Sequence, residues 1–176
     1  AAKYSNLEAA KLLLEAGADM NSRAQLPKHN GGATPLFFAE CSPKLVSLLL
    51  EAGADVTLKV AVDFGDAWGL NFETVLGYYT SCIDANAEVV KMLLDAGADP
   101  NGQDTLFGAA PLHNVALPSG DEVVKLGKLL LEYGADPLLT NKGGEIPLDF
   151  AKELSKNQDL IDLLTEATEK ALKSSA

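Results

Sequence analysis

The chain has 176 residues, enough for one domain or one array of small units, and 47% of them are hydrophobic, so a sizeable core is possible. Its formal net charge of −11 at pH 7 argues against a nucleic-acid binder, because phosphate contacts need clustered lysines and arginines, and against docking on anionic lipid. No apolar run approaches the ~20 residues of a membrane-spanning helix.

Four segments of similar sequence predict four helices of one kind. They read "LLLEAGADMN" at 12–21, "LLLEAGADVT" at 48–57, "MLLDAGADPN" at 92–101 and "LLLEYGADPL" at 129–138. Apolar residues recur at helical spacing before and within each segment. The glycine after each leucine-rich run predicts a helix end in the left-handed region. These glycines are Gly17, Gly53, Gly97 and Gly134, which lie 36, 44 and 37 residues apart.

A second recurring unit predicts a shorter helix before each later leucine-rich helix. It reads "TPLFFAE" at 34–40, "TVLGYYT" at 74–80, "APLHNVA" at 110–116 and "IPLDFAK" at 146–152. Thr34 and Pro35 combine a capping hydroxyl with a proline preset for the first helical position. Of the later copies, the one at 74–80 keeps only the capping residue, Thr74. The copies at 110–116 and 146–152 keep only the proline. Each repeat is therefore expected to contain a short helix, a turn, a long helix and an extended excursion.

A helix–turn–helix–excursion unit of about 33 residues is typical of the ankyrin repeat, and the whole chain resembles that family. The segment "APLHNVA…EVVKLGKLLLEYGADP" matches the family pattern most closely. The resemblance implies an all-α solenoid of stacked helix pairs, with β-hairpin or loop fingers projecting to one side. We expect a single domain over 1–176. Its repeats are predicted at about 1–30, 31–70, 71–106, 107–142 and 143–173.

The two ends of the array differ in the sequence. The first repeat lacks the start of its first helix, which favours a chain cut from a longer array, whereas the last repeat has both helices and a polar end that caps the stack.

The fingers differ in length. From the helix-ending glycine to the next threonine position the steps are 17, 21, 13 and 12 residues, so finger one carries about five extra residues and finger two about nine. Finger two contains "VAVDFGDAWGLNFE" at 60–73, where Phe64, Trp68 and Phe72 recur every fourth residue. This spacing suggests a turn or two of helix at the tip. The aromatic side chains either pack on their own repeat or face a partner protein.

The third repeat departs from the family pattern. Gly77 replaces the expected histidine, and Tyr78 and Tyr79 stand where small residues are usual. Either Gly77 makes room for finger two to fold back onto the tyrosines, or the tyrosines are anchors exposed on the concave face. A further alternative is a small-molecule pocket that finger two roofs, lined by Trp68 and both tyrosines.

The chain offers no residues with catalytic or metal-binding spacing. The two cysteines, Cys41 and Cys82, and the two histidines, His29 and His113, do not have zinc-ligand spacing. The family assigns His113 to hydrogen bonds with neighbouring turns, and the "GAD" aspartates recur once per repeat, as structural residues do. Nothing pairs a nucleophile with a base. We expect that the chain is not an enzyme and binds no cofactor or metal. We expect it in the cytoplasm or another reducing compartment.

Two asparagines leave alternatives open. Asn21 and Asn101 follow the "GAD" motif. In the ankyrin family such an asparagine can be hydroxylated, and a hydrogen-bonding turn residue explains it equally well.

The resemblance implies a protein–protein interaction scaffold that uses its concave face and elongated fingers. The alternative is a regulatory or targeting segment of a larger enzyme or channel. We expect a monomer, and a partner with a basic patch, because residues 60–124 hold ten acids and Lys91 as the only lysine or arginine. The candidate contact residues are Arg23, Gln25, Lys28, His29, Lys59, Phe64, Trp68, Leu70, Phe72, Tyr78, Ser81, Gln103, Thr105, Leu106, Phe107, Asn141 and Lys142, with Cys41 and Leu117 beside them.

Overall fold

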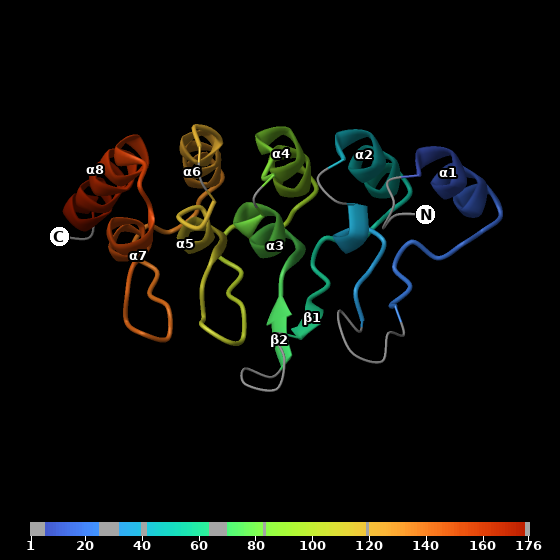
Figure 1. The fold of residues 1–176 in the computed structure, drawn as a ribbon, viewed down its shortest axis with the longest axis horizontal. Helices are drawn as coiled ribbons and strands as arrows, with labels where there is room; N and C mark the ends of the chain where they lie inside the picture. The colour runs from blue at the N-terminus through green and yellow to red at the C-terminus, as the bar shows by residue number, and fades with distance from the viewer. Residues whose placement is uncertain are drawn as a thin grey trace.

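A computed structural model describes residues 6–24, 32–39, 42–63, 70–82, 84–118 and 120–174. Two rows of helices run along one axis, with the fingers on one side (Figure 1). The outer row is α1 (Leu7–Glu15), α2 (Pro43–Glu51), α4 (Ala87–Asp95), α6 (Glu122–Glu132) and α8 (Gln158–Ser174). The inner row is the 3₁₀ turn η2 (Phe37–Ala39), α3 (Val75–Ser81), α5 (Pro111–Asn114) and α7 (Pro147–Leu154). The predicted all-α solenoid is confirmed.

The outer helices end where the glycines predict. Gly17, Gly53, Gly97 and Gly134 have φ between +81° and +92°, a region that favours glycine. In each case the residue after the glycine donates its N–H back into the helix, as Ala98 does to the carbonyl oxygen of Leu93 at 3.0 Å. This reversal sends the chain from each of these four outer helices toward the fingers.

The inner segment of the second repeat corrects one prediction. Thr34 and Pro35 do not begin an α-helix, because the described segment forms only the η2 turn. The Thr34 hydroxyl is buried without a hydrogen-bond partner, whereas the Thr74 hydroxyl accepts from the N–H of Gly77 at 3.0 Å. Pro43 explains the difference, since a residue before proline avoids helical geometry and Ser42 is extended. The inner segment has no room for a second turn.

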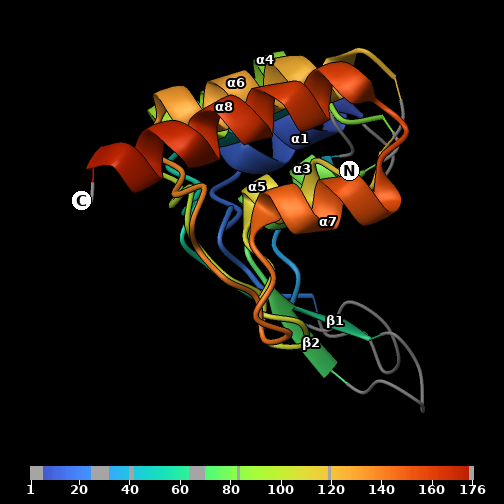
Figure 2. The same cartoon turned by 90° about the vertical axis from the view of Figure 1, so that its left-hand side faces the viewer.

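The two described arms of finger two form an antiparallel β-hairpin. β1 (Val60–Asp63) and β2 (Leu70–Glu73) pair antiparallel, with Val60 opposite Glu73. Figure 2 shows this hairpin projecting from the inner helices on the same side as the other fingers. The prediction of helix is therefore wrong for Phe72, which lies in β2, while Phe64 and Trp68 lie outside the described residues.

An asparagine after each of two "GAD" motifs bridges neighbouring repeats. The Asn21 side chain donates to the carbonyl oxygen of Gly53 at 3.2 Å and accepts from the N–H of Asp55 at 2.8 Å. The same pair of bonds joins Asn101 to Gly134 and Asp136, at 3.0 and 2.8 Å. We call this contact the asparagine bridge. It supports the role of a hydrogen-bonding turn residue for both side chains.

The bridge is replaced at the junction between the second and third repeats. Thr57 occupies the equivalent position, four residues after Gly53, and its hydroxyl donates to its own neighbour Asp55 at 2.6 Å. Threonine has no amide, so it cannot donate with an NH2 group and accept with a carbonyl oxygen across the junction, as asparagine does.

Replacing Thr57 by asparagine is expected to raise the free energy of unfolding by about 1 kcal/mol. The new amide can take the place that Asn101 takes at its own junction, with Gly97 and Asp99 as partners. Urea denaturation measures the gain, and Thr57→Ala is the matched control that offers no amide. Equal midpoints for the two variants would contradict the expectation.

Candidate interaction surface

One side chain in each of fingers one to three donates to the backbone of the next finger. Arg23 Nη1 donates to the carbonyl oxygen of Lys59 at 3.0 Å, and Lys59 Nζ donates to that of Gln103 at 3.0 Å. Gln103 Nε2 continues the series to the carbonyl oxygen of Thr140 at 2.9 Å. All four residues stand six positions after the helix-ending glycine. We call this series the finger ladder, and it fixes the spacing of the fingers.

Finger three is further braced by its own aspartate and by a lysine from finger four. The buried Asp104 carboxylate accepts from the N–H groups of Leu106, Phe107 and Ala109 at 2.7 to 2.9 Å. Lys142 donates its N–H to the carbonyl oxygen of Phe107 at 2.8 Å and its ammonium group to that of Thr105 at 2.5 Å. These bonds hold the bend of finger three, where the Phe107 side chain is half exposed.

The structure gives several of the predicted contact residues a role inside the finger row. Arg23, Lys59, Gln103 and Lys142 use their polar groups in the bonds above, and the Asn141 side chain accepts from the N–H groups of its own turn. The common position after each glycine is the signal in the sequence that could have revealed the ladder. Gln25, Lys28, His29, Cys41, Phe64 and Trp68 lie outside the described residues, and Leu70 and Phe72 are placed by their backbone in β2.

The two tyrosines of α3 have different environments. Tyr79 is fully buried, and its hydroxyl donates to the carbonyl oxygen of Leu36 in the preceding repeat at 2.9 Å. Its interpretation as an exposed anchor is therefore wrong. Tyr78 is half-buried and stacks on Phe37, with ring centroids 4.1 Å apart. Ser81 lies one turn on and donates to the carbonyl oxygen of Tyr78 at 2.8 Å.

Glu73 uses the space beside Gly77. A Cβ atom on Gly77 would lie 3.3 Å from Glu73 Oε1 and 3.0 Å from the Thr74 hydroxyl oxygen. Burial, and then the neighbouring acidic groups of Asp104 and Cys82, raise the pKa of the Glu73 carboxyl to about 8. Gly77 thus makes room for the side chain of Glu73, the last residue of finger two, whereas the folding of the finger onto Tyr78 and Tyr79 stays a prediction.

His113 has the structural environment that the family implies. Its ring is fully buried, and Nδ1 accepts from the N–H of Ala110 at 3.2 Å. Nε2 then carries the proton and donates to the carbonyl oxygen of Glu145, in the next repeat, at 3.0 Å. Burial lowers the pKa of the ring, because the charged form would lose its hydration. His113 therefore bridges two repeats as a neutral imidazole.

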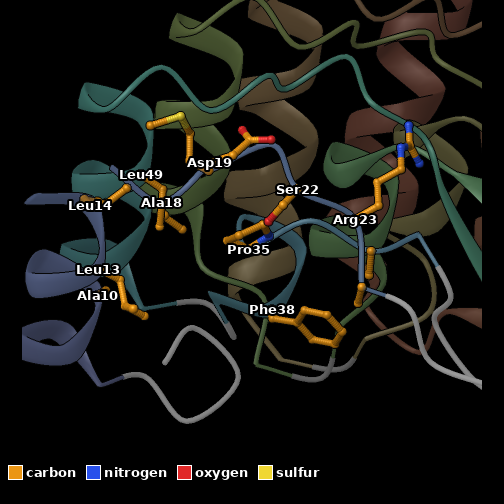
Figure 3. Close-up of a pocket in the computed structure, with 13 residues that line it drawn as sticks. Ala10, Leu13, Leu14, Ala18, Asp19, Ser22, Arg23, Pro35, Phe38 and Leu49 are labelled. Atoms are coloured by element: carbon orange, nitrogen blue, oxygen red, sulfur yellow. The ribbon is translucent and has the colours of Figure 1, made fainter. Parts of the chain in front are cut away.

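An apolar groove of about 320 Å³ opens at the α1 end of the array. Ala10 and Leu13 line it from α1, and Pro35 and Phe38 line it from the inner segment of the second repeat (Figure 3). Asp19 and Arg23 are polar residues of its lining. We call this cavity the α1 groove.

The described residues were searched for metal-binding clusters and membrane-spanning helices. Within them, no group of three or more His, Cys, Asp and Glu side chains could hold a metal ion. None of the helices described is both long enough and apolar enough to cross a membrane.

The comparisons with known proteins agree with this architecture. The family model for ankyrin repeats in three copies matches residues 79–174, more than half of the chain, and the single ankyrin-repeat model matches residues 1–25. The chain belongs to the ankyrin-repeat family. Ankyrin repeats are generally protein–protein interaction modules.

The relatives of this ankyrin array include much longer proteins. It is 31% identical over 159 residues to the mitochondrial disaggregase of Bos taurus, which covers 87% of this chain and 20% of that protein. It is 30% identical over 121 residues to the putative ankyrin repeat protein R664 of Acanthamoeba polyphaga mimivirus, covering 64% and 72%. It is 39% identical over 66 residues to the human 2-5A-dependent ribonuclease, covering 38% and 8%. The chain thus spans a fifth of the disaggregase.

Proposed function

We propose that this ankyrin array is a scaffold that binds a partner protein through its concave face and its fingers. The finger ladder is the observation that supports this most, because it joins four fingers into one row through bonds at a single repeat position. A surface ordered before binding loses less conformational entropy in the complex. A solenoid also offers an extended concave surface rather than a deep pocket.

Half-exposed apolar side chains of finger three and of the inner row are the proposed anchors. Phe107 lies at the bend of finger three, and Leu117 follows α5 in the inner row. Tyr78 is half-buried and stacks on Phe37. Large apolar and aromatic residues dominate the binding energy of protein interfaces. The other candidate contact residues named from the sequence remain proposals.

Charge favours a partner with a basic patch. The exposed acids of the central repeats include Asp84, Glu88 and Asp99. Complementary charge speeds association and selects the partner. We propose that the array works as a monomer in the cytoplasm or another reducing compartment, without catalysing a reaction itself.

A second candidate function is that of a regulatory or targeting segment within a larger enzyme. It is favoured by the match of 87% of this chain to only a fifth of the disaggregase. The scaffold surface would then contact another domain of the same protein, or recruit a substrate to it. The full-length sequence decides between the two, since a catalytic domain beside the array supports the second.

The double variant Phe107→Ser, Leu117→Ser is expected to lose at least about tenfold in affinity for proteins that the unchanged chain captures. Both side chains are half exposed, so the array should stay folded, which circular dichroism checks. Leu172→Ser is the matched control, because Leu172 is equally exposed but lies in α8. Retention of every partner by the folded double variant would refute the proposed surface.

A further inference from the structure

Two carboxyl groups from different fingers are buried close enough to act on each other. Glu73 is the last residue of β2 in finger two, and Asp104 lies in finger three. Each of these residues is only 8% exposed. Burial raises the pKa of Glu73 to about 8, and the charge of Asp104 is the second cause. The two acids therefore repel each other across the junction of fingers two and three whenever both are ionised.

Hydrogen bonds stabilise a charge on only one of the two acids. The Asp104 carboxylate accepts from three N–H groups of its own finger, those of Leu106, Phe107 and Ala109. No N–H or O–H group of a described residue donates to the Glu73 carboxyl. A buried carboxylate without donors loses its hydration and gains nothing in return. The packed junction therefore suits Glu73 only in its neutral form.

The junction closes tightly around Glu73 because two glycines lie there. A Cβ atom on Gly77 would lie 3.3 Å from Glu73 Oε1, and one on Gly102 would lie 3.0 Å from Thr74 Cγ2. The base of finger three thus lies directly against the residue that follows Glu73. An ionised Glu73 carboxyl can regain its hydration only if the two fingers separate.

Few described contacts oppose a separation of the two fingers. Lys59 Nζ donates to the carbonyl oxygen of Gln103 at 3.0 Å, and Lys59 is itself exposed. The helices behind the fingers are held more firmly, because α3 and α5 pack on each other and on α4 and α6. Elements with few buried contacts open at a lower free energy than the core. Finger two can therefore move while the helices stay folded.

We propose that Glu73 is a proton-controlled latch on finger two. Its neutral carboxyl holds finger two against finger three, and its ionisation releases finger two while the helices stay folded. Because the fingers belong to the proposed binding surface, release of finger two weakens the binding of a partner. The release itself is independent of the scaffold function, whereas its effect on binding rests on that function.

Among the described residues, three other titratable or charged groups act on this junction. Cys82 follows α3 and also raises the pKa of Glu73. His113 of α5 faces Asp104, and burial lowers the pKa of its ring, so the ring is neutral at pH 8. Lys59 supplies the ammonium group of the finger ladder. A cysteine thiol ordinarily ionises at about pH 8.5, so the titration of Cys82 overlaps with that of Glu73.

Amide hydrogen exchange of the unchanged chain and of Glu73→Gln, followed by mass spectrometry at pH 5 and pH 8, tests the latch. Glutamine has nearly the shape of the neutral acid and never ionises. For the amides of residues 60–63, 70–73 and 104–109, the rate in the unchanged chain divided by that in Glu73→Gln is expected to rise at least about tenfold from pH 5 to pH 8. Cys82→Ser is the matched control and should show the same rise as the unchanged chain.

The same measurement distinguishes release of finger two from unfolding of the array. At pH 8 the finger amides of the unchanged chain should be at least about tenfold less protected than those of α6, which open only with the whole array. Equal protection of the fingers and α6 would overturn the proposal. So would a rate ratio that does not change with pH. A rise that Cys82→Ser abolishes would also overturn it, because the thiol would then be the titrating group.

Capture of partner proteins tests the effect on binding. At pH 8 a partner captured by the unchanged chain should bind Glu73→Gln at least about twofold more tightly, the gain expected when half of the molecules have released finger two. Equal affinities at pH 8, beside the expected rise in exchange, would support the latch and count against fingers two and three as the binding surface.

Discussion

Replacing Glu73 by glutamine is expected to raise the free energy of unfolding by roughly 2 to 4 kcal/mol near pH 8. The carboxyl of Glu73 is buried beside Asp104 and Cys82, and these surroundings raise its pKa to about 8. In the unfolded chain the same group ionises near its ordinary value of 4.5. Between about pH 4.5 and pH 8, folding therefore requires the Glu73 carboxyl to take up a proton. Above about pH 8, folding buries its negative charge. Glutamine has nearly the same shape and never ionises.

The sign of the pH dependence follows from the raised pKa. Below about pH 4.5 Glu73 is protonated in both states, so its carboxyl does not oppose folding. As the pH rises from about 4.5 to about 8, the folded state binds more protons than the unfolded state, and the stability falls. Above about pH 8 the loss is complete. Glu73→Gln should flatten this part of the profile.

Urea denaturation from pH 5 to pH 9 measures the effect. Glu166→Gln is the matched control, because it removes an exposed carboxylate from α8. If Glu73→Gln and Glu166→Gln shift the midpoint equally at every pH, the Glu73 carboxyl is not ionising in a buried site.

Replacing His113 by alanine is expected to lower the free energy of unfolding by about 3 to 5 kcal/mol. The substitution leaves the N–H of Ala110 and the carbonyl oxygen of Glu145 without their ring partners, and it opens a cavity in the core. Thermal and urea unfolding measure the loss. His29→Ala changes the other histidine and is the control.

The imidazole also gives a pH dependence of the opposite sign. Because burial lowers the pKa of His113 in the folded state, its neutral form stabilises the fold fully above the unfolded value of about 6.5. That stability is lost as the pH falls below this value toward the folded pKa. The unchanged chain should lose stability on acidification from pH 7 to pH 5 in a component that His113→Ala lacks. An identical slope in both proteins would contradict the assigned neutral ring.

Local signals in the sequence predicted the repeat architecture correctly. The helix ends predicted from the glycines were correct, because a backbone with positive φ favours glycine whatever the tertiary contacts are. The prediction for His113 also succeeded, because the family pattern places it beside a fixed carbonyl. By contrast, Thr34 and Pro35 predicted a helix that Pro43 prevents eight residues further along the chain.

The finger contacts were not predicted from the sequence, although the residues of the ladder share one position after each helix-ending glycine. Lys59 and Gln103 are 44 residues apart. The local sequence around a lysine does not show whether its ammonium group binds a distant carbonyl oxygen or water. The role of Glu73 depends on the missing side chain of Gly77, four residues away, so neither residue alone indicates it. The contact surface stays a prediction, and the structure adds the bonds that some of its side chains make within the finger row.

The replacement of the asparagine bridge by Thr57 has a mechanical consequence. A linear array is held together only by contacts between neighbours, so its most compliant joint is the junction with the weakest cross-links. Between the second and third repeats, the polar coupling includes the Tyr79 hydroxyl and the bond from Lys59 to Gln103, beside the stack of Tyr78 on Phe37. Tyr78 is also a proposed contact residue. A partner that binds Tyr78 would therefore add a contact at this junction and make it stiffer.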